Sequence, residues 1–504
     1  MSRLLFDCPT KVLFGLFVCL LGLGCCRALH ASPLPAPQLT IESKQTDEGR
    51  QSIIYRMTVT PAAEPVPALR HRLMVMPHET KPGNYATYYL RSHGENSVQG
   101  HIDLLDDLFG KNEAYEQLKI PLAEMDMEKL KQFDKSFEAY VKNHLRRATL
   151  CRDTDWGLEE EDLRGVETYE FLLPSVQDTR SVSKMLALRA RIAIAEGRYE
   201  DAIETFKMNL KLARTVSEMK FLVADLVGIA EVGIGNRALA DLIAAKDSPN
   251  LYWAIAEIPN PCIDIRDAMQ MEMSFILRLF PDLEDAETAV RSKEEWNRVY
   301  RNMFKGLHEF RELGVGSSFP EIGLLTVPLA LTSYSAAKDR LIERGMSRDD
   351  VEKMAVGQVL MIDTRHEILL LANDLEKSLY VPAEARKAFE NAVEDRLYRD
   401  QPFENLGRAI GSMLLPATYQ IRSAQLRTES QLRAFQVVEA IRMHVADTGE
   451  LPKTIDEIKI VPVPLNPGTG KKFVYWLDGD TAVIDIPFSD GYHQAFSFMI
   501  QVAK

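Results

Sequence analysis

The apolar residues of this chain recur every three or four positions from about residue 113 to about residue 445. This spacing puts them on one face of each α-helix and therefore predicts a body of many amphipathic helices. Two such helices are separated by Gly197, and neither can bury its apolar face without stacking on neighbours. We therefore expect a mainly α fold: a helical-repeat-like body of helix pairs, a short N-terminal β segment, and a small C-terminal helix-plus-β-hairpin module.

Strand signals lie at the two ends of the chain. Residues 39–60 alternate between apolar and polar, and residues 69–76 have the composition of a second strand. Near the C-terminus a long helix is expected to end at Gly449, and an alternating strand follows over residues 482–486. The expected parts are a signal peptide at 1–31, an extended or β segment at 32–80, a helical body at 81–416, and a long helix plus small β module at 417–504.

Charge and composition exclude some classes of partner. Of the 504 residues 46% are hydrophobic and 26% charged, which is ordinary for a soluble globular protein. The chain has 60 Lys and Arg residues against 73 Asp and Glu residues, a net charge of −13. Nucleic-acid phosphates need a basic face, and anionic membranes attract basic segments. Neither nucleic acid nor an anionic membrane surface is therefore an expected partner.

The N-terminus predicts export. Arg3 and Lys11 precede an apolar run, residues 12–24, that is shorter than the roughly 20 residues of a membrane span and suits a signal peptide. Ala31 provides a small residue for cleavage. Cys25 ends a stretch similar to a bacterial lipobox, so lipidation there is the alternative, and an uncleaved anchor is the third. After cleavage no integral membrane span is expected.

Cleavage after Ala31 leaves two cysteines, Cys151 and Cys262. In an oxidising compartment they can form one disulfide, and two buried, unpaired thiols are the alternative. The sequence leaves both open.

A glycine-rich segment, Gly468 to Lys471, invites comparison with a phosphate-binding loop. That motif requires glycine where Leu465 stands and Ser or Thr where Lys472 stands. A strand follows here in place of the required helix. We therefore expect a turn between strands, with glycine supplying the positive φ.

Three polar residues, Asp363, His366 and Glu367, have the spacing of one helix face. Such a face can hold a metal ion when another helix supplies further ligands. The pattern lacks a repeated Glu-x-x-His, and the favoured interpretation is an exposed polar face with local charge pairs.

Other candidate sites also have an ordinary explanation. Carboxylates that could bind calcium are scattered near the C-terminus, but they do not follow an EF-hand spacing: Asp478, Asp480, Asp485 and Asp490. Tyr252 and Trp253 could stack on a ligand, although packing between helices is the favoured interpretation. We assign no catalytic, metal-binding or cofactor-binding residue and expect no cofactor.

The helix pair around Gly197 resembles a tetratricopeptide unit. Its turn glycine, packing aromatic, small residue and core aromatic match at Gly197, Tyr199, Ala202 and Phe206. Asn209 and Arg214 stand where the repeat prefers alanine and proline.

The tail resembles the C-terminal half of a type II secretion major pseudopilin, in which a helix, a proline-rich loop and a glycine turn precede a closing β-sheet. The matching residues are Gly449, Leu451, Pro452, Pro464, Asn466, Pro467, Gly470, Phe473 and Tyr475. The resemblance implies a component associated with a secretion or pilus-like assembly, or reuse of the module elsewhere.

The whole chain resembles uncharacterised exported bacterial proteins that combine such a tail with tetratricopeptide-like helices. The segments that carry this resemblance are 65–70, 82–84, 197–199 and 250–254. The function we expect is a non-catalytic, exported scaffold or protein-binding module of the bacterial envelope, periplasmic or extracellular, with protein partners. The alternatives are the secretion component and an envelope hydrolase whose site is built from dispersed residues.

Overall fold

The computed structural model describes residues 38–45, 50–95, 98–158, 176–312, 326–398, 405–487 and 494–503. The expected signal peptide, its cleavage at Ala31, the alternative lipidation at Cys25, and Asp490 lie outside these residues.

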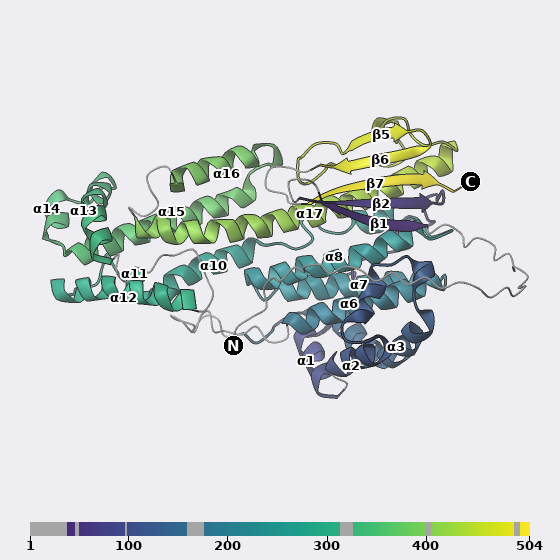
Figure 1. The fold of residues 1–504 in the computed structure, drawn as a ribbon, viewed down its shortest axis with the longest axis horizontal. Helices are drawn as coiled ribbons and strands as arrows, with labels where there is room; N and C mark the ends of the chain where they lie inside the picture. Colours follow the sequence, from purple (N-terminus) through teal and green to yellow (C-terminus); the bar gives the residue numbers. More distant parts are fainter. Residues whose placement is uncertain are drawn as a thin grey trace, which may run out of the picture. The chain divides into compact units, whose positions relative to one another are not determined.

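The described residues are mainly helical, with strands near the N-terminus and the C-terminus, which confirms the expected mainly α fold class (Figure 1). The N-terminal helices are α1 (Tyr85–Glu95), α2 (Val98–Phe109), η1 (Glu113–Leu118), η2 (Leu122–Glu124), α3 (Met127–Tyr140), the π-helical turn η3 (Val141–Leu145) and α4 (Arg146–Thr149). They are followed by α6 (Val176–Ala195), α7 (Tyr199–Ser217), α8 (Leu222–Ala244), α9 (Tyr252–Ala256), α10 (Arg266–Leu279), α11 (Pro281–Glu284) and α12 (Lys293–Glu312). The remaining helices are α13 (Thr326–Glu343), α14 (Arg348–Lys353), α15 (Val356–Tyr380), α16 (Ala383–Tyr398), α17 (Leu406–Thr448) and η7 (Ile455–Glu457).

One five-stranded sheet joins the two ends of the chain. Its strands are β1 (Leu39–Gln45), β2 (Gln51–Val59), β5 (Val474–Asp478), β6 (Thr481–Ile486) and β7 (Gln494–Val502). Their order is β1-β2-β7-β6-β5, and β2 runs parallel to β7 while the other pairs are antiparallel. The expected C-terminal hairpin is therefore part of a larger sheet that N-terminal strands complete.

Helix α17 packs against one face of this sheet. The Tyr55 ring stacks on Phe498 at 4.8 Å and meets Phe435 of α17 edge-on at 5.9 Å. The side-chain amide of Gln431 donates a hydrogen bond of 2.6 Å to the Tyr55 hydroxyl. The helix ends where the sequence predicts, with Gly449 in the left-handed region at φ 80°.

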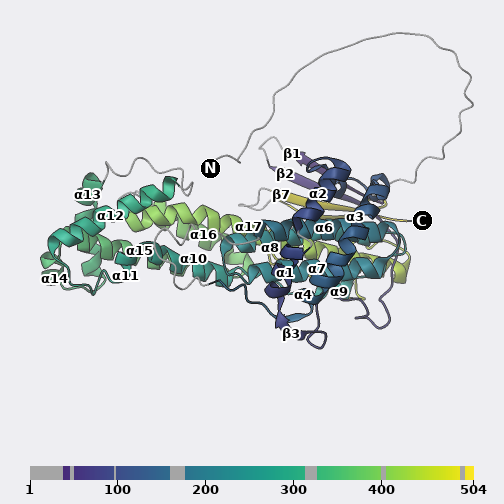
Figure 2. The same cartoon turned by 90° about the horizontal axis from the view of Figure 1, so that it is seen from below.

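Helices α6, α7 and α8 pack on one another, and α3 and α4 contact them (Figure 2). The helix pair predicted around Gly197 is formed by α6 and α7. Asn209, where the tetratricopeptide pattern prefers alanine, is buried and ties the three helices together. It accepts a hydrogen bond from the Ser183 hydroxyl at 2.7 Å and donates one to the Glu231 carbonyl at 3.0 Å.

The strand expected at residues 69–76 is wrong, because this segment consists of turns and irregular backbone. Its N–H groups at Leu73 and Met74 donate to the carboxylate of Glu257 at 2.8 and 3.0 Å, in place of a neighbouring strand. A short parallel pair that the sequence did not predict, β3 (Lys81–Asn84) with β4 (Cys151–Asp153), follows.

Cys151 and Cys262 are both buried and unpaired, in two different hydrophobic clusters. The alternative of two buried thiols is therefore the one that the structure supports. In the part of the chain that the structure describes, every helix is too short or too polar to cross a membrane.

Candidate functional site

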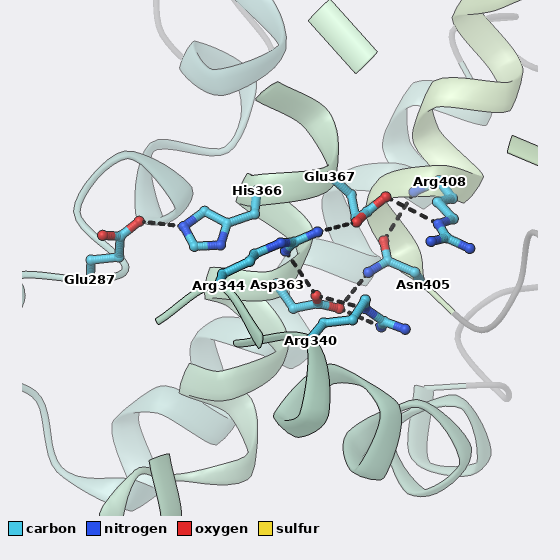
Figure 3. A network of polar contacts seen from close by, with 8 residues as sticks. All are labelled: Glu287, Arg340, Arg344, Asp363, His366, Glu367, Asn405 and Arg408. Carbon is cyan, nitrogen blue, oxygen red and sulfur yellow. Dashed lines mark hydrogen bonds and ion pairs between the residues drawn. The ribbon is translucent and has the colours of Figure 1, made fainter. Parts of the chain in front are cut away.

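Helix α15 carries the three polar residues that the sequence singled out, and it points them to two different places (Figure 3). Asp363 and Glu367 are buried, with 2% and 5% of their surface exposed. His366 lies at the surface side of the helix. The expected exposed polar face is therefore wrong for the two carboxylates, because neighbouring helices cover them.

Asp363 is held by Arg340 of α13, by Arg344 directly after that helix, and by the residue before α17. Arg340 donates from Nε at 2.9 Å and from Nη2 at 2.6 Å, the two-bond geometry that suits a carboxylate. Arg344 donates from Nη1 at 3.4 Å, and the Asn405 side-chain amide also donates to Asp363. All three partners are donors, and their bonds reach both oxygens of the Asp363 carboxylate.

Glu367, one turn further along α15, shares Arg344 and adds Arg408 of α17, whose Nε lies 3.0 Å away. Burial opposes ionisation of this carboxyl, but the hydrogen bonds and charges of the two arginines outweigh it and lower its pKa. Asn405 completes the cluster by accepting the Arg408 main-chain N–H at 3.0 Å as the N-cap of α17.

His366 points away from this cluster toward Glu287, in the segment after α11, with 2.8 Å between Nε2 and the carboxylate. Arg365 reaches the same carboxylate at 2.9 Å. The Glu287 side chain is 43% exposed, so this is a surface charge pair. The expected charge pairs are therefore at the surface for these two residues, but their partner comes from a distant segment and not from the same helix face.

The arrangement of Asp363 and Glu367 is that of a clamp between α13, α15 and α17. Each carboxylate is engaged by guanidinium groups, which leaves its oxygens occupied. Among the described residues, no group of three or more His, Cys, Asp or Glu side chains has an arrangement that could hold a metal ion.

The other sequence candidates occupy ordinary structural positions. Gly470 has φ 69°, and its N–H donates to the Asn466 carbonyl at 2.8 Å, which confirms the expected turn and positive φ. Only the strand after the turn, β5, is formed, because the segment before it is an irregular loop. Asp485 accepts from the Ser497 hydroxyl across the sheet at 2.5 Å. Tyr252 is buried in the larger hydrophobic cluster and Trp253 is packed against that cluster, which confirms the packing interpretation.

A second polar site, which the sequence analysis missed, lies between the N-terminal helices and the α6–α7 pair. It is a cavity of about 290 Å³, and we call it the charged cleft. Its lining consists of four acidic, four basic and three other side chains: Asp134, Glu138, Asp201, Glu204, Lys142, Arg146, Arg189, Arg198, Val141, Thr205 and Met208.

Arg189 of α6 organises the acidic side of the charged cleft. It donates to Asp134 at 2.5 Å and also to Glu138, and so joins α6 to α3. Burial raises the pKa of Asp134, although Arg189 acts against that shift. Opposite, Arg198 at the start of α7 pairs with Asp201 at 2.5 Å. These pairs fix the walls of the cleft.

The basic side of the charged cleft is open. Lys142 and Arg146 are exposed, and neither forms an ion pair with any residue that the structure describes. Lys142 belongs to the π-helical turn η3, a backbone form that is found frequently at functional sites.

A signal for the charged cleft was present in the sequence. Asp134, Glu138, Lys142 and Arg146 follow one another at intervals of four residues, which is one stripe of a helix. The opposite wall comes from helices that are distant in the sequence, so the stripe alone does not reveal a cavity.

No protein-family model, no curated protein and no solved structure matches this chain.

Proposed function

We propose that this chain is an exported helical scaffold of the bacterial envelope that binds a protein partner through the charged cleft. The observation that carries the proposal is the pair of exposed cations, Lys142 and Arg146, beside a wall of fixed ion pairs. An acidic segment of a partner protein would complete the charge pattern that the described residues leave open.

Polar lining favours a protein segment over an apolar small molecule. Small-molecule pockets are mostly apolar with a few polar groups, whereas eight of the eleven side chains that line this cleft are charged. Complementary charges across a protein interface provide specificity and a fast encounter. A partner protein therefore binds more specifically when the acids and bases that it meets already have fixed positions.

Rigidity supports the scaffold role. The arginine clamp on Asp363 and Glu367 connects three helices, and the Arg191 guanidinium bonds Asp241 at 2.7 Å with both side chains almost completely buried. No described residue of the three clamped helices lines the charged cleft, whereas Arg191 belongs to α6, which forms part of one wall, and its ion pair holds α6 to α8.

The experiment that tests the binding role compares two double variants of equal charge change. Lys142→Glu with Arg146→Glu reverses the open side of the charged cleft. Lys453→Glu with Lys459→Glu makes the same change on exposed residues of the tail. Each tagged chain is expressed in its native host, cross-linked and purified, and the bound proteins are quantified.

We expect one or more proteins to be recovered with the unchanged chain and with the tail variant, and to be reduced at least about tenfold with the cleft variant. Equal recovery with all three chains would overturn the proposal. Both variants should keep the helical circular-dichroism spectrum, which separates loss of binding from loss of fold.

The location follows from the N-terminal signal and has its own test. We expect the chain to fractionate with the envelope or the medium, and a chain that lacks residues 2–31 to remain in the cytoplasm. Retention of the unchanged chain in the cytoplasm would refute the export part of the proposal and leave the binding test unaffected.

A further inference from the structure

Strand β5 is an edge of the five-stranded sheet (Figure 1). Among the described residues, none outside the sheet forms a hydrogen bond with the main chain of Val474–Asp478. An edge strand with unpaired N–H and C=O groups is a template for another strand. Natural sheets usually protect such an edge with charged side chains or proline.

The two edges of this sheet differ in that protection. Strand β1, at the other edge, carries Glu42 and Lys44, and Glu42 pairs with Arg56 at 2.8 Å. The middle of β5 has no charged residue, and Val474 and Trp476 are 50% and 44% exposed. The apolar exposed edge is therefore β5.

The register of the hairpin shows which main-chain groups of β5 point outward. A two-residue turn follows β5, with Gly479 at φ 61°, so Asp478 and Thr481 form the first hydrogen-bonded pair of the β5–β6 ladder. Hydrogen-bonded pairs alternate along an antiparallel ladder. The N–H and C=O groups of Tyr475 and Leu477 consequently point away from β6.

Strand β5 is complementary to itself in one antiparallel register. When Tyr475 lies opposite Tyr475 of a second copy, their outward N–H and C=O groups face one another. Val474 then lies opposite Trp476, and Lys472 lies opposite Asp478, and each of these pairs occurs twice by symmetry. These are non-hydrogen-bonded positions, where opposing side chains come closest.

We propose that two copies of this chain associate through antiparallel pairing of β5, which makes one continuous ten-stranded sheet. The occupant of the edge is a second copy because the matching apolar pair and Asp478 lie on β5, and the matching cation, Lys472, lies two residues before the strand begins. Lys472 now contacts Asp456, and both side chains are more than half exposed. An ammonium group has three donors, so Lys472 can keep this contact and still meet Asp478.

The interface is small, which sets the expected strength. Stable protein interfaces bury about 1,600 Å² in total, and five residues of strand with three exposed apolar side chains cover less than that. We therefore expect a reversible dimer with a micromolar dissociation constant. In sedimentation velocity experiments on the purified chain, the sedimentation coefficient should rise from that of a monomer to that of a dimer as the concentration increases from about 1 to 100 μM.

Two charge reversals test the register. Lys472→Glu and Asp478→Lys each place like charges opposite one another twice, so each variant alone should dimerise about tenfold more weakly. Mixed together, the two variants restore both opposite-charge pairs and should form a heterodimer as strong as the original dimer. If dimerisation recovers when the two variants are mixed, the weak association of each variant alone was not caused by unfolding.

Control variants isolate the edge. Asp456→Asn removes the present partner of Lys472, and Lys44→Glu reverses a charge on the opposite edge; both should leave the dissociation constant unchanged. Leu477→Pro removes one outward N–H without removing a bond to β6 and should abolish the dimer. A chain that stays monomeric throughout the series, a mixture that does not recover, or a dimer that Leu477→Pro leaves intact would each overturn the proposal.

Discussion

Replacing Asp363 by asparagine should loosen α13, α15 and α17 without changing the volume of the side chain. The carboxylate is 2% exposed and receives donors from Arg340, Arg344 and Asn405. Asparagine removes the charge and turns an NH₂ group toward a cluster of donors. Arg340 and Arg344 then lose this carboxylate as a partner in a mostly buried place, and Arg344 retains Glu367.

The size of the effect follows from the burial of the partners. Removing one member of a buried ion pair costs about 3 to 5 kcal/mol. The side chains of Arg340 and Arg344 are 17% and 26% exposed, so water partly stabilises them after the loss. We therefore expect a value near the lower limit, about 3 kcal/mol.

Amide hydrogen exchange measured by mass spectrometry reports this loss locally, because exchange follows the free energy of local opening. A loss of 3 kcal/mol corresponds to roughly a hundredfold faster exchange in peptides of α13 and α15. Glu287→Gln is the matched control. It removes a carboxylate that pairs with α15 but is 43% exposed, so it should cost less than about 1 kcal/mol.

Equal exchange in the two variants would refute the clamp. A second check uses Glu367→Gln, which disturbs the same Arg344. Because Asp363 and Glu367 share this arginine, the double variant should cost less than the sum of the single variants. Simple addition would show that the two carboxylates act independently.

Three further predictions concern the interior. Burial raises the pKa of Glu231 from 4.5 to about 8, so only the folded chain holds this proton between those values. As pH rises from 4.5 to about 8, the contribution of Glu231 to the free energy of unfolding should fall by on the order of 1 kcal/mol per pH unit. Glu231→Gln removes the titrating group, so the urea midpoint of this variant should depend less on pH. Gly228→Ala should lower the free energy of unfolding, measured by urea denaturation, by about 1 to 3 kcal/mol, because its Cβ would lie 2.6 Å from a main-chain oxygen of α7. Gly233→Ala on the same helix meets open space and should raise the free energy of unfolding by about 0.5 to 1 kcal/mol. Cys151 and Cys262 should react with Ellman's reagent only after unfolding, and failure to react in denaturant would show that they are oxidised.

Local features of the fold were predictable from the sequence. Helical spacing of apolar residues located the body, and Gly197, Gly449 and Gly470 marked turns or helix ends where each has a positive φ. These features depend on residues within a few positions of one another, so they do not require knowledge of the neighbours in space.

Pairing between distant segments was not predictable. Alternation in residues 51–59 shows that one face of a strand is buried, but it does not show that the neighbour is β7 at residues 494–502. A deletion of residues 431–504, which looks like removal of a separate tail, would also take from β2 its partner strand and the Phe435 and Phe498 rings that cover Tyr55. Loss of function after such a deletion would therefore report loss of the sheet.

The tertiary structure also determines which charged side chains are buried. The spacing of Asp363, His366 and Glu367 established one helix with a polar stripe, and the same stripe is compatible with solvent, a metal ion or a core. The carboxylates became buried because α13 and α17 bring Arg340, Arg344 and Arg408 to them. Sequence periodicity determines which side chains share a face, since it is a property of consecutive residues. Whether that face can leave water depends on charges that other segments supply, and only the folded chain brings them within hydrogen-bonding distance.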